Sequence, residues 1–392
     1  MRLAGFVQKN PLQFLPARER PLHGVTKHNH AYRPKTRSRE KQEELIQRIF
    51  SRTHYISHQD KGAYLLEKQF SHGKKLGRGA YANVYEALYI PYTSSMKAQY
   101  VALKILEPRE DSIRNCEHEW AINVRLDKRK LRSSKNTLLL AFDRFTFPPS
   151  APYYAANKEV LAFDIMDKTL ALHIRDLSKM NAINKLKMAQ HFGRQILEGL
   201  SLCHALGVRH SDLSPNNILV KDGNVKIIDF GMSSCPEVSY INIDLTYIQT
   251  RWWRAPEVLL ERTPFSEEID VWSAALIFYE IITNKHFLPG NDSLDQLSHI
   301  IKLLGLPEKE YFSQSKNKHP YEKEEKIRSL FENHASLRST LSDRLKSAGI
   351  TDPDFHDLMS KMLCWDPEKR LSAEQCLDHP FFKKIFDVMT VT

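Results

Sequence analysis

One segment near the middle of the chain places three polar side chains close together through its own turn chemistry. Asp212 and Asn217 precede the segment 218–228, which is apolar at both ends, and Asp229 follows it. The dipeptide Asp222-Gly223 interrupts this segment and is a strong signal for a two-residue β-hairpin turn. Because a hairpin returns the chain to its starting point, we expect the three side chains to be neighbours. Their oxygen atoms suit Mg²⁺, and a carboxylate also accepts the proton of a hydroxyl group.

Two glycines near residue 77 indicate a loop that approaches phosphate. Gly77 and Gly79 are separated by one residue and precede the strand-like run 84–90. Glycine has no Cβ, so its backbone N–H group can come close to phosphate oxygens. Ala82 stands where the third glycine of a G-x-G-x-x-G motif would be. Taken alone, this segment indicates an ordinary glycine-rich turn equally well.

A lysine interrupts the apolar strand Val101–Leu106. A buried ammonium group is costly unless an anion pairs with it, so Lys104 needs an acidic partner. Glu119 is suitable because it shares a helical face with Ile122, whereas Glu117 is turned to the far side of the helix. The alternative for Lys104 is an edge-strand lysine that points to solvent.

The order of apolar patterns predicts two units of different class. Strand-like runs surround one helical stretch near 115–126, and they cover 84–90, 101–106, 137–147 and 160–166. After Met166 the pattern changes to long amphipathic helices, with Met188, Phe192, Ile196 and Leu200 at four-residue steps. We therefore expect a mainly β unit followed by a mainly α unit.

Seven motifs in one order resemble those of the eukaryotic protein kinases. Four are the glycine loop, Lys104, the catalytic loop at 210–217 and Asp229-Phe230-Gly231. The others are Ala255-Pro256-Glu257, Asp270-Val271-Trp272-Ser273 and Asp366-Pro367-Glu368-Lys369-Arg370. The resemblance spans about residues 69–382 and implies an α+β, bilobal protein kinase fold. It implies a small β-rich N-lobe over about 69–165 and a larger α-helical C-lobe over about 166–382.

The resemblance also implies the cofactors, ATP and Mg²⁺, and a role for each matched residue. Asp212 would orient and deprotonate the acceptor hydroxyl, and Asn217 and Asp229 would hold Mg²⁺. Lys104, paired to Glu119, would hold the α- and β-phosphates of ATP. The residues implied to bind ATP are Leu76, Gly77, Gly79, Ala80, Val84, Ala102, Lys104, Glu119, Phe163, Asp164, Met166 and Leu219. Structural roles are implied for His210, Glu257, Asp270 and Arg370, with Glu257 and Arg370 as a buried ion pair.

The segment 247–257 is similar to the CMGC group, which contains the cyclin-dependent, MAP, dual-specificity Tyr-regulated and Clk-like kinases. Its first residues, Tyr-Ile-Gln-Thr-Arg, are nearest to the dual-specificity Tyr-regulated and splicing-factor branches. These act on Ser/Thr hydroxyls and autophosphorylate on Tyr. Tyr247 and Thr250 then lie in the activation loop, where Arg251 and Arg254 could pair with a phosphate. The alternative for Tyr247 is an ordinary packed tyrosine.

Two residues depart from the family pattern. Ser211 replaces the Arg that precedes the catalytic Asp and clamps a phosphorylated activation loop, so we expect activity to depend less on that phosphate. Ser214 replaces the Lys that steadies the γ-phosphate, which predicts a slow enzyme. The alternative is a pseudokinase that binds nucleotide or a partner without useful transfer.

The positive charge of the chain is concentrated before residue 69. Residues 1–68 hold 14 Lys and Arg against 6 Asp and Glu, out of a net charge of +10 for all 392 residues. With four prolines and no sustained apolar period, 1–68 reads as a basic, largely disordered extension, and 383–392 as a short tail. A weak contact between 1–68 and nucleic acid or another anionic surface is an accessory hypothesis.

Apolar content and cysteine usage indicate the compartment. No apolar run approaches the roughly 18 residues that a membrane span needs. Five scattered cysteines form neither a zinc spacing nor a disulfide framework, so we expect reduced thiols. The sequence therefore predicts an intracellular protein, nuclear or cytoplasmic. The resemblance to the kinases implies that its partners are protein substrates with Ser/Thr acceptors.

Overall fold

The computed structural model describes residues 53–58, 62–67, 75–79, 81–91, 98–109, 112–130, 137–147, 158–238, 249–308, 321–334 and 336–384. The chain divides into two compact units, each described by itself. The smaller unit comprises Met1–Cys116 and Ala141–Ile165, and the larger unit comprises Glu117–Leu140 and Met166–Thr392.

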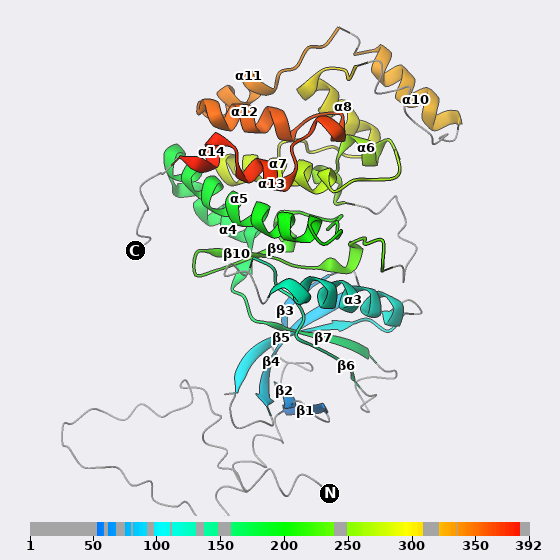
Figure 1. Cartoon of the computed structure of the whole chain (residues 1–392), viewed down its shortest axis with the longest axis vertical. Coiled ribbons are helices and arrows are strands. Elements are labelled where there is room, and N and C mark those ends of the chain that lie inside the picture. The colour runs from blue at the N-terminus through cyan, green and yellow to red at the C-terminus, as the bar shows by residue number, and fades with distance from the viewer. Residues whose placement is uncertain are drawn as a thin grey trace, which may run out of the picture. The chain divides into compact units, whose positions relative to one another are not determined.

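The smaller unit is built on one antiparallel sheet. Its strands are β1 (Thr53–His58), β2 (Gly62–Glu67), β3 (Lys75–Arg78), β4 (Ala82–Pro91), β5 (Gln99–Leu106), β6 (Asp143–Phe147) and β7 (Lys158–Asp164). They lie in the order β1-β2-β4-β5-β7-β6, with β3 paired to β4 (Figure 1). Alternate side chains of β4 and β5 form the core of this sheet, because successive residues of a strand point to opposite faces. Tyr85, Ala87, Val101 and Leu103 face that core.

The sheet begins before residue 69, within the stretch 1–68 that the sequence analysis reads as an extension. The hairpin β1–β2 falls inside the predicted extension, and β2 pairs with β4 from Gly62 to Leu65. Tyr64 is fully buried, its ring stacks 4.8 Å from those of Tyr89 and Phe145, and its hydroxyl donates to Asp143 Oδ2 at 2.8 Å. The hairpin was missed because its two strands are only six residues each and lie in a stretch read as one basic extension. Residues 1–52 lie outside the described residues.

Tyr64→Phe is expected to lower the free energy of unfolding by about 1.5–3 kcal/mol, since it removes a buried hydrogen bond to a carboxylate while keeping the ring. Denaturant unfolding of the full chain measures this change. Tyr81→Phe is the matched control, because Tyr81 is exposed in the same unit. Equal stability of the two variants would show that the Tyr64 hydroxyl contributes nothing.

Helix α3 (Ser112–Lys130) is longer at both ends than the predicted stretch 115–126. Its first residues belong to the smaller unit and the rest to the larger one. Ile122 and Leu126 are fully buried in the core of the larger unit, and Glu119 is 3% exposed. The predicted face of this helix is therefore the buried one, while Glu117 is only partly buried.

The predicted strand 137–147 divides between the two units. Only Asp143–Phe147 forms a strand, β6. Leu138 instead makes a parallel bridge to Ile227, and Leu138 and Leu140 are buried in the core of the larger unit. An apolar run predicts burial but does not specify its partner, which is why the prediction joined two separate segments.

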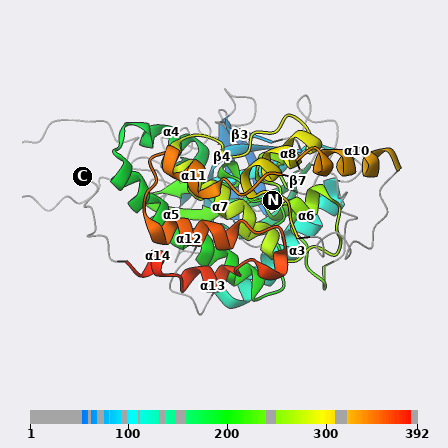
Figure 2. The ribbon, with the colours of Figure 1, turned by 90° about the horizontal axis from the view of Figure 1, so that it is seen from above.

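The larger unit is mainly helical. Its helices are α4 (Leu170–Asp176), α5 (Ala182–His204), α6 (Pro256–Leu259), α7 (Glu268–Thr283), α8 (Ser293–Leu304), α10 (Tyr321–Glu332), α11 (Leu341–Ser347), α12 (Pro353–Met362), α13 (Ala373–Leu377) and α14 (Pro380–Lys383). Helix α7 is mostly apolar and buried along nearly its whole length, and α5 and α12 pack against it (Figure 2). The predicted α+β class, with a β-rich first part and a larger helical second part, is confirmed. None of the helices in the described ranges is long and apolar enough to cross a membrane.

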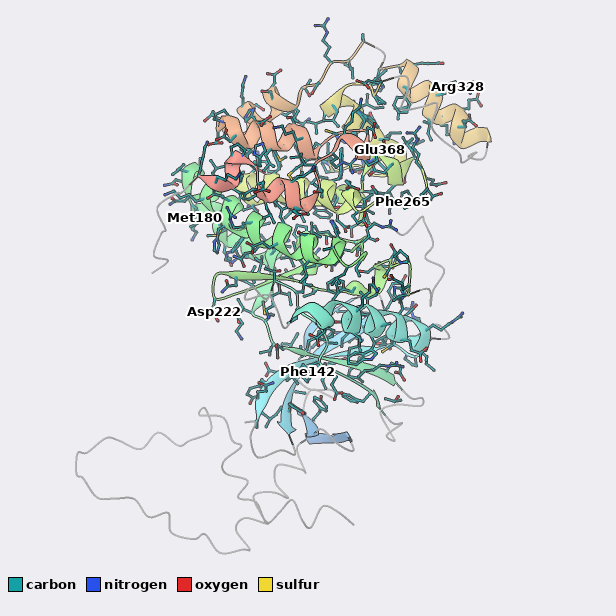
Figure 3. The ribbon with its side chains drawn as sticks, in the orientation of Figure 1. Phe142, Met180, Asp222, Phe265, Arg328 and Glu368 are labelled. Carbon is teal, nitrogen blue, oxygen red and sulfur yellow. The ribbon has the colours of Figure 1, made fainter. Side chains whose placement is uncertain are left out.

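A small antiparallel sheet of the larger unit carries the predicted hairpin. Strands β9 (Ile218–Lys221) and β10 (Asn224–Ile227) pair in register, and β8 (Lys168–Thr169) adds to β9. Asp222 and Gly223 both have positive φ, as a type I′ turn requires. Asp222 marks the tip of this hairpin in Figure 3. The prediction of a hairpin at this dipeptide is confirmed.

Candidate active site

The segment before Asp212 is held by a buried carboxylate of α7. Asp270 accepts hydrogen bonds from the backbone N–H groups of His210 and Ser211 at 2.8 and 2.9 Å, and it lies 3.0 Å from His204 Nε2. Complete burial by itself raises the pKa of Asp270, but these contacts outweigh burial and hold it below its ordinary value. Asp270 is therefore a charged anchor for the loop.

His210 connects this loop to the strand that precedes Asp229. Its Nε2 lies 2.9 Å from the carbonyl oxygen of Ile228, and its ring packs edge-on against Phe230. Its own carbonyl accepts from Ser233 Oγ at 3.1 Å. Because its side chain contacts a backbone carbonyl and an aromatic ring in a buried place, His210 supports the loop.

Asp212 is oriented by two neutral donors. Asn217 Nδ2 donates to the Asp212 carbonyl at 2.7 Å and to Oδ2 at 3.0 Å, and Thr250 Oγ1 donates to Oδ1 at 2.9 Å. Burial raises the pKa of Asp212, the charge of Asp229 acts in the same direction, and the two hydrogen bonds act against it. A carboxylate with a raised pKa is a stronger base than an ordinary Asp, as proton abstraction from a hydroxyl requires.

A backbone hydrogen bond brings Asp229 close to Asp212 and Asn217. The N–H of Ile228 donates to the Asn217 carbonyl at 3.0 Å, and Asp229 itself adopts a left-handed conformation with φ of 65°. A Cβ on Gly231 would lie 3.4 Å from Asp229 Oδ1 and 3.6 Å from Glu119 Oε2. The carboxylates of Asp229 and Glu119 therefore both lie next to the space that a side chain at position 231 would occupy.

The donor set of Asn217 and Asp229 fits Mg²⁺. The side-chain nitrogen of Asn217 donates to Asp212, so its side-chain oxygen, Oδ1, remains available as a metal ligand. Mg²⁺ is commonly bound by one or two protein oxygens together with phosphates and water. In the part of the chain that the structure describes, no group of three or more His, Cys, Asp and Glu could hold a metal on protein ligands alone.

The smaller unit presents its predicted ATP-binding residues on one face of the sheet. Lys104 on β5 pairs with Val84 on β4, and Ala102 pairs with Phe163 on β7. Cross-strand partners share a face, so these four side chains lie opposite the buried core residues. The Gly79 N–H donates to the Ala82 carbonyl at 2.8 Å, which closes the glycine loop.

The remaining predicted ATP-binding residues are distributed over both units. In the smaller unit, Leu76 and Asp164 are exposed, and a Cβ on Gly77 would meet no atom within 4 Å. In the larger unit, Met166 and Leu219 are partly buried. Ala80 lies outside the described residues, as does Tyr247 of the activation loop.

Both arginines predicted to pair with a phosphate donate to backbone oxygens. Arg254 donates to the Gln249 carbonyl through Nε at 3.2 Å and through Nη2 at 2.8 Å. Arg251 donates to the carbonyl of Asn291. In the described residues these bonds order the segment around Thr250.

Gln249 is a structural centre that the sequence did not reveal. Its side chain donates to the Ile269 carbonyl and to Ser273 Oγ, both at 2.8 Å, and accepts from the Ala255 N–H at 2.8 Å. Its backbone N–H donates to the Ser211 carbonyl at 2.8 Å. Gln249 thus joins the loop of Asp212 to α7. No periodic or spacing signal could have identified it, because one polar residue in a loop has no pattern.

Glu257 and Arg370 form a bidentate ion pair in the core of the larger unit. The two bonds measure 2.8 and 3.1 Å, and Arg370 also donates at 2.8 Å to the carbonyls of Glu268 and Cys364. The guanidinium group lies over the Trp272 ring. These residues are far apart in sequence, and the pair ties α6 to the segment just before α13.

Comparison with known families agrees with this geometry. The family model described as the protein kinase domain matches residues 70–382. The chain belongs to the protein kinase family. The kinase is 31% identical over 322 residues to cyclin-dependent kinase B2-1 of Arabidopsis thaliana, which covers 79% of this chain and 92% of that protein.

Two further relatives place the kinase near the same group. Cyclin-dependent kinase 1 of Encephalitozoon cuniculi is 29% identical over 319 residues, which are 81% of this chain and 98% of that protein. The mitogen-activated protein kinase HOG1 of Cochliobolus heterostrophus is 37% identical over 199 residues, about half of each chain. The kinase is a serine/threonine protein kinase with relatives among the cyclin-dependent and mitogen-activated kinases. The family implies ATP and a divalent metal ion.

Proposed function

We propose that the kinase transfers the γ-phosphoryl group of ATP to Ser/Thr hydroxyl groups of proteins, with Asp212 as the proton acceptor. The observation that carries this proposal is the arrangement around Asp212, whose two carboxylate oxygens each accept one hydrogen bond from a neutral donor. These bonds hold the plane of the carboxylate, and the remaining lone pairs are left for the acceptor hydroxyl. The hydroxyl proton goes to Asp212 as the new oxygen–phosphorus bond forms, while the bond between the γ-phosphorus and the bridging oxygen of ATP breaks and ADP leaves.

Each unit contributes its own residues to the proposed binding of the cofactors. Asn217 and Asp229 would hold Mg²⁺, which offsets the charge on the transferring phosphoryl group. Lys104 would hold the α- and β-phosphates, and its pairing with Glu119 stays a prediction. Gly77 and Gly79 leave the edge of the sheet free of side chains where phosphate is expected to approach.

The alternative is a pseudokinase that binds nucleotide or a partner protein. Phosphate incorporation from Mg-ATP into the kinase and into a basic Ser/Thr substrate distinguishes the two, with Asp212→Asn as the control. Transfer that Asp212→Asn abolishes supports the kinase. A folded protein that gains thermal stability with ATP but transfers nothing supports the pseudokinase.

We further propose that the kinase belongs to the dual-specificity Tyr-regulated and Clk-like branches, on the residues 247–251. Ser211 supports this assignment, because a small hydroxyl residue before the catalytic Asp resembles the splicing-factor branches. Its hydroxyl accepts from Arg209 Nε at 3.1 Å. Arg209 also donates to the carbonyl of Phe265, which is labelled in Figure 3. The guanidinium group of Arg209 thereby links the catalytic loop to Phe265 by hydrogen bonds that involve no phosphate.

Tyr247→Phe is accordingly expected to retain most of the activity in a peptide assay. The reason is that the usual Arg, which a phosphorylated loop would engage, is Ser211 in this chain. The measurement compares kcat/KM of the variant and the unmodified kinase, with phosphate on Tyr247 quantified by mass spectrometry. Complete loss of activity in a folded Tyr247→Phe protein contradicts the prediction.

Ser214→Lys is expected to raise kcat by roughly tenfold or more, since it restores a cation that stabilises charge on the transferring group. Ser214 is buried at the start of the short turn Pro215–Asn217. Ser214→Met is therefore the matched control, with similar length and no charge. If both variants fold and turn over at the same rate, Ser214 does not limit the reaction.

Cellular context stays a set of proposals from the sequence. We propose protein substrates with Ser/Thr acceptors and a nuclear or cytoplasmic location. A contact between nucleic acid and the basic extension would be an accessory function. RNA binding with steep salt dependence that is lost on deletion of residues 1–52 supports it, and no binding at low salt contradicts it.

A further inference from the structure

His118 is a buried titratable residue without a role in the proposed reaction. It precedes Glu119 in α3, is 1% exposed, and its Nε2 lies 2.7 Å from the carbonyl oxygen of Ser233. Burial lowers the pKa of His118, so the neutral ring is favoured. Since a carbonyl only accepts, Nε2 carries the hydrogen and donates it. Nδ1 has no hydrogen-bond partner within the described part of the chain.

Ser233 also contacts the catalytic loop. It is fully buried, follows Asp229-Phe230-Gly231 closely, and donates through Oγ to the His210 carbonyl at 3.1 Å. The His210 N–H in turn donates to Asp270. A continuous line of buried hydrogen bonds therefore runs from the helix that carries Glu119 to the loop that carries Asp212.

A second anchor holds the same helix further along its length. Arg125 Nε donates to the Leu206 carbonyl at 2.8 Å, and Nη2 forms an ion pair with Glu237 at 2.5 Å. The Glu237 side chain is 62% exposed, so this ion pair contributes little stability. Ile122 and Leu126 provide apolar contact but allow small rotations of a helix. The buried bond of His118 is a directional contact between α3 and Ser233 directly beside Glu119.

We propose that His118 is a positioning residue, whose bond to Ser233 fixes the rotation of α3 and thereby places the Glu119 carboxylate beside Asp229 and Gly231. The inference rests on the proposed function, because His118 acts through Glu119. Adjacent helical residues turn together, so a rotation that breaks the His118 bond also withdraws Glu119. The contact itself joins two neutral groups of this chain, the His118 ring and the Ser233 carbonyl.

Two amide variants distinguish positioning from general packing. The Gln amide nitrogen lies as many bonds from Cα as His Nε2, so His118→Gln can still donate to Ser233. The Asn amide nitrogen corresponds to Nδ1, so His118→Asn cannot reach. We expect His118→Asn to lower kcat/KM by roughly tenfold to a hundredfold, the size expected for a displaced catalytic group, while His118→Gln retains most activity.

The same substitutions in a Glu119→Gln background test whether His118 acts through Glu119. Once the Glu119 carboxylate is absent, His118→Asn is expected to cost little further activity, a non-additivity that marks coupled residues. All variants are full-length proteins compared by thermal unfolding. If His118→Asn does not fold, His118→Met replaces it, because Met has similar length and no donor.

The outcomes separate this inference from the proposed function. Equal activity of His118→Asn and the unmodified kinase overturns it, as does an undiminished loss in the Glu119→Gln background. Loss of activity in His118→Gln equal to that in His118→Asn also overturns it. If the unmodified kinase shows no transfer that depends on Asp212, the proposed function fails, and the role of His118 fails with it.

Discussion

Asp229→Asn is expected to reduce phosphoryl transfer by roughly a thousandfold, because charge stabilisation is the main contribution of the protein to this chemistry. The substitution keeps the size of the side chain and removes its charge. The Asp229 carboxylate lies beside Gly231, where no side chain fills the space. The residue before Asp229, Ile228, donates its N–H to the Asn217 carbonyl. The fold should therefore survive the change while the metal site does not.

The measurement has two parts, kcat for transfer and the affinity for ATP with and without Mg²⁺. We expect the unmodified kinase to bind ATP more tightly when Mg²⁺ is present, and Asp229→Asn to lose most of that gain. Asp222→Asn is the matched control, since Asp222 is an exposed carboxylate at the tip of the β9–β10 hairpin. An unchanged Mg²⁺-dependent gain in Asp229→Asn would exclude Asp229 as a metal ligand.

Arg370→Leu is expected to lower the free energy of unfolding by about 3–5 kcal/mol, the usual cost of leaving one partner of a buried ion pair alone. Both side chains of the pair with Glu257 are at most 4% exposed. The substitution also removes donors to the Glu268 and Cys364 carbonyls. Denaturant unfolding measures the effect on the full chain.

A surface ion pair provides the comparison. Lys369 lies next to Arg370 and pairs with Glu308, but both side chains are more than half exposed. Lys369→Met is therefore expected to cost less than about 1 kcal/mol. Glu257→Gln combined with Arg370→Leu should be more stable than Arg370→Leu alone, because no buried charge is left. A similar cost for Arg370→Leu and Lys369→Met would show that the buried pair has no special role.

Local chemistry explains the features of this fold that were predicted correctly. Asp222 and Gly223 produce a hairpin wherever they stand between two strands, because their backbone preferences match a type I′ turn. The buried face of α3 follows from the helical period of Glu119 and Ile122. Residues close together in sequence, such as Asp212 and Asn217, also meet in space because only a short turn separates them.

Features that depend on partners far away in the sequence were predicted less well. The apolar residues Leu138–Ala141 were joined to a neighbouring strand, although Leu138 pairs with Ile227. The hairpin β1–β2 was assigned to an extension because its burial depends on Tyr64 meeting Asp143. Periodicity indicates which side of an element is buried but not what covers it.

The amino-acid sequence by itself determined the fold class, the order of the kinase motifs and the identity of the charged residues that chemistry requires. These depend on residue type and on short spacings, which the sequence states directly. Only the tertiary structure revealed that Thr250 orients Asp212, that Gln249 ties the catalytic loop to α7, and that His118 joins α3 to Ser233. Each of these contacts is a hydrogen bond between residues far apart in the chain, and such a bond depends on a distance that only the folded backbone sets.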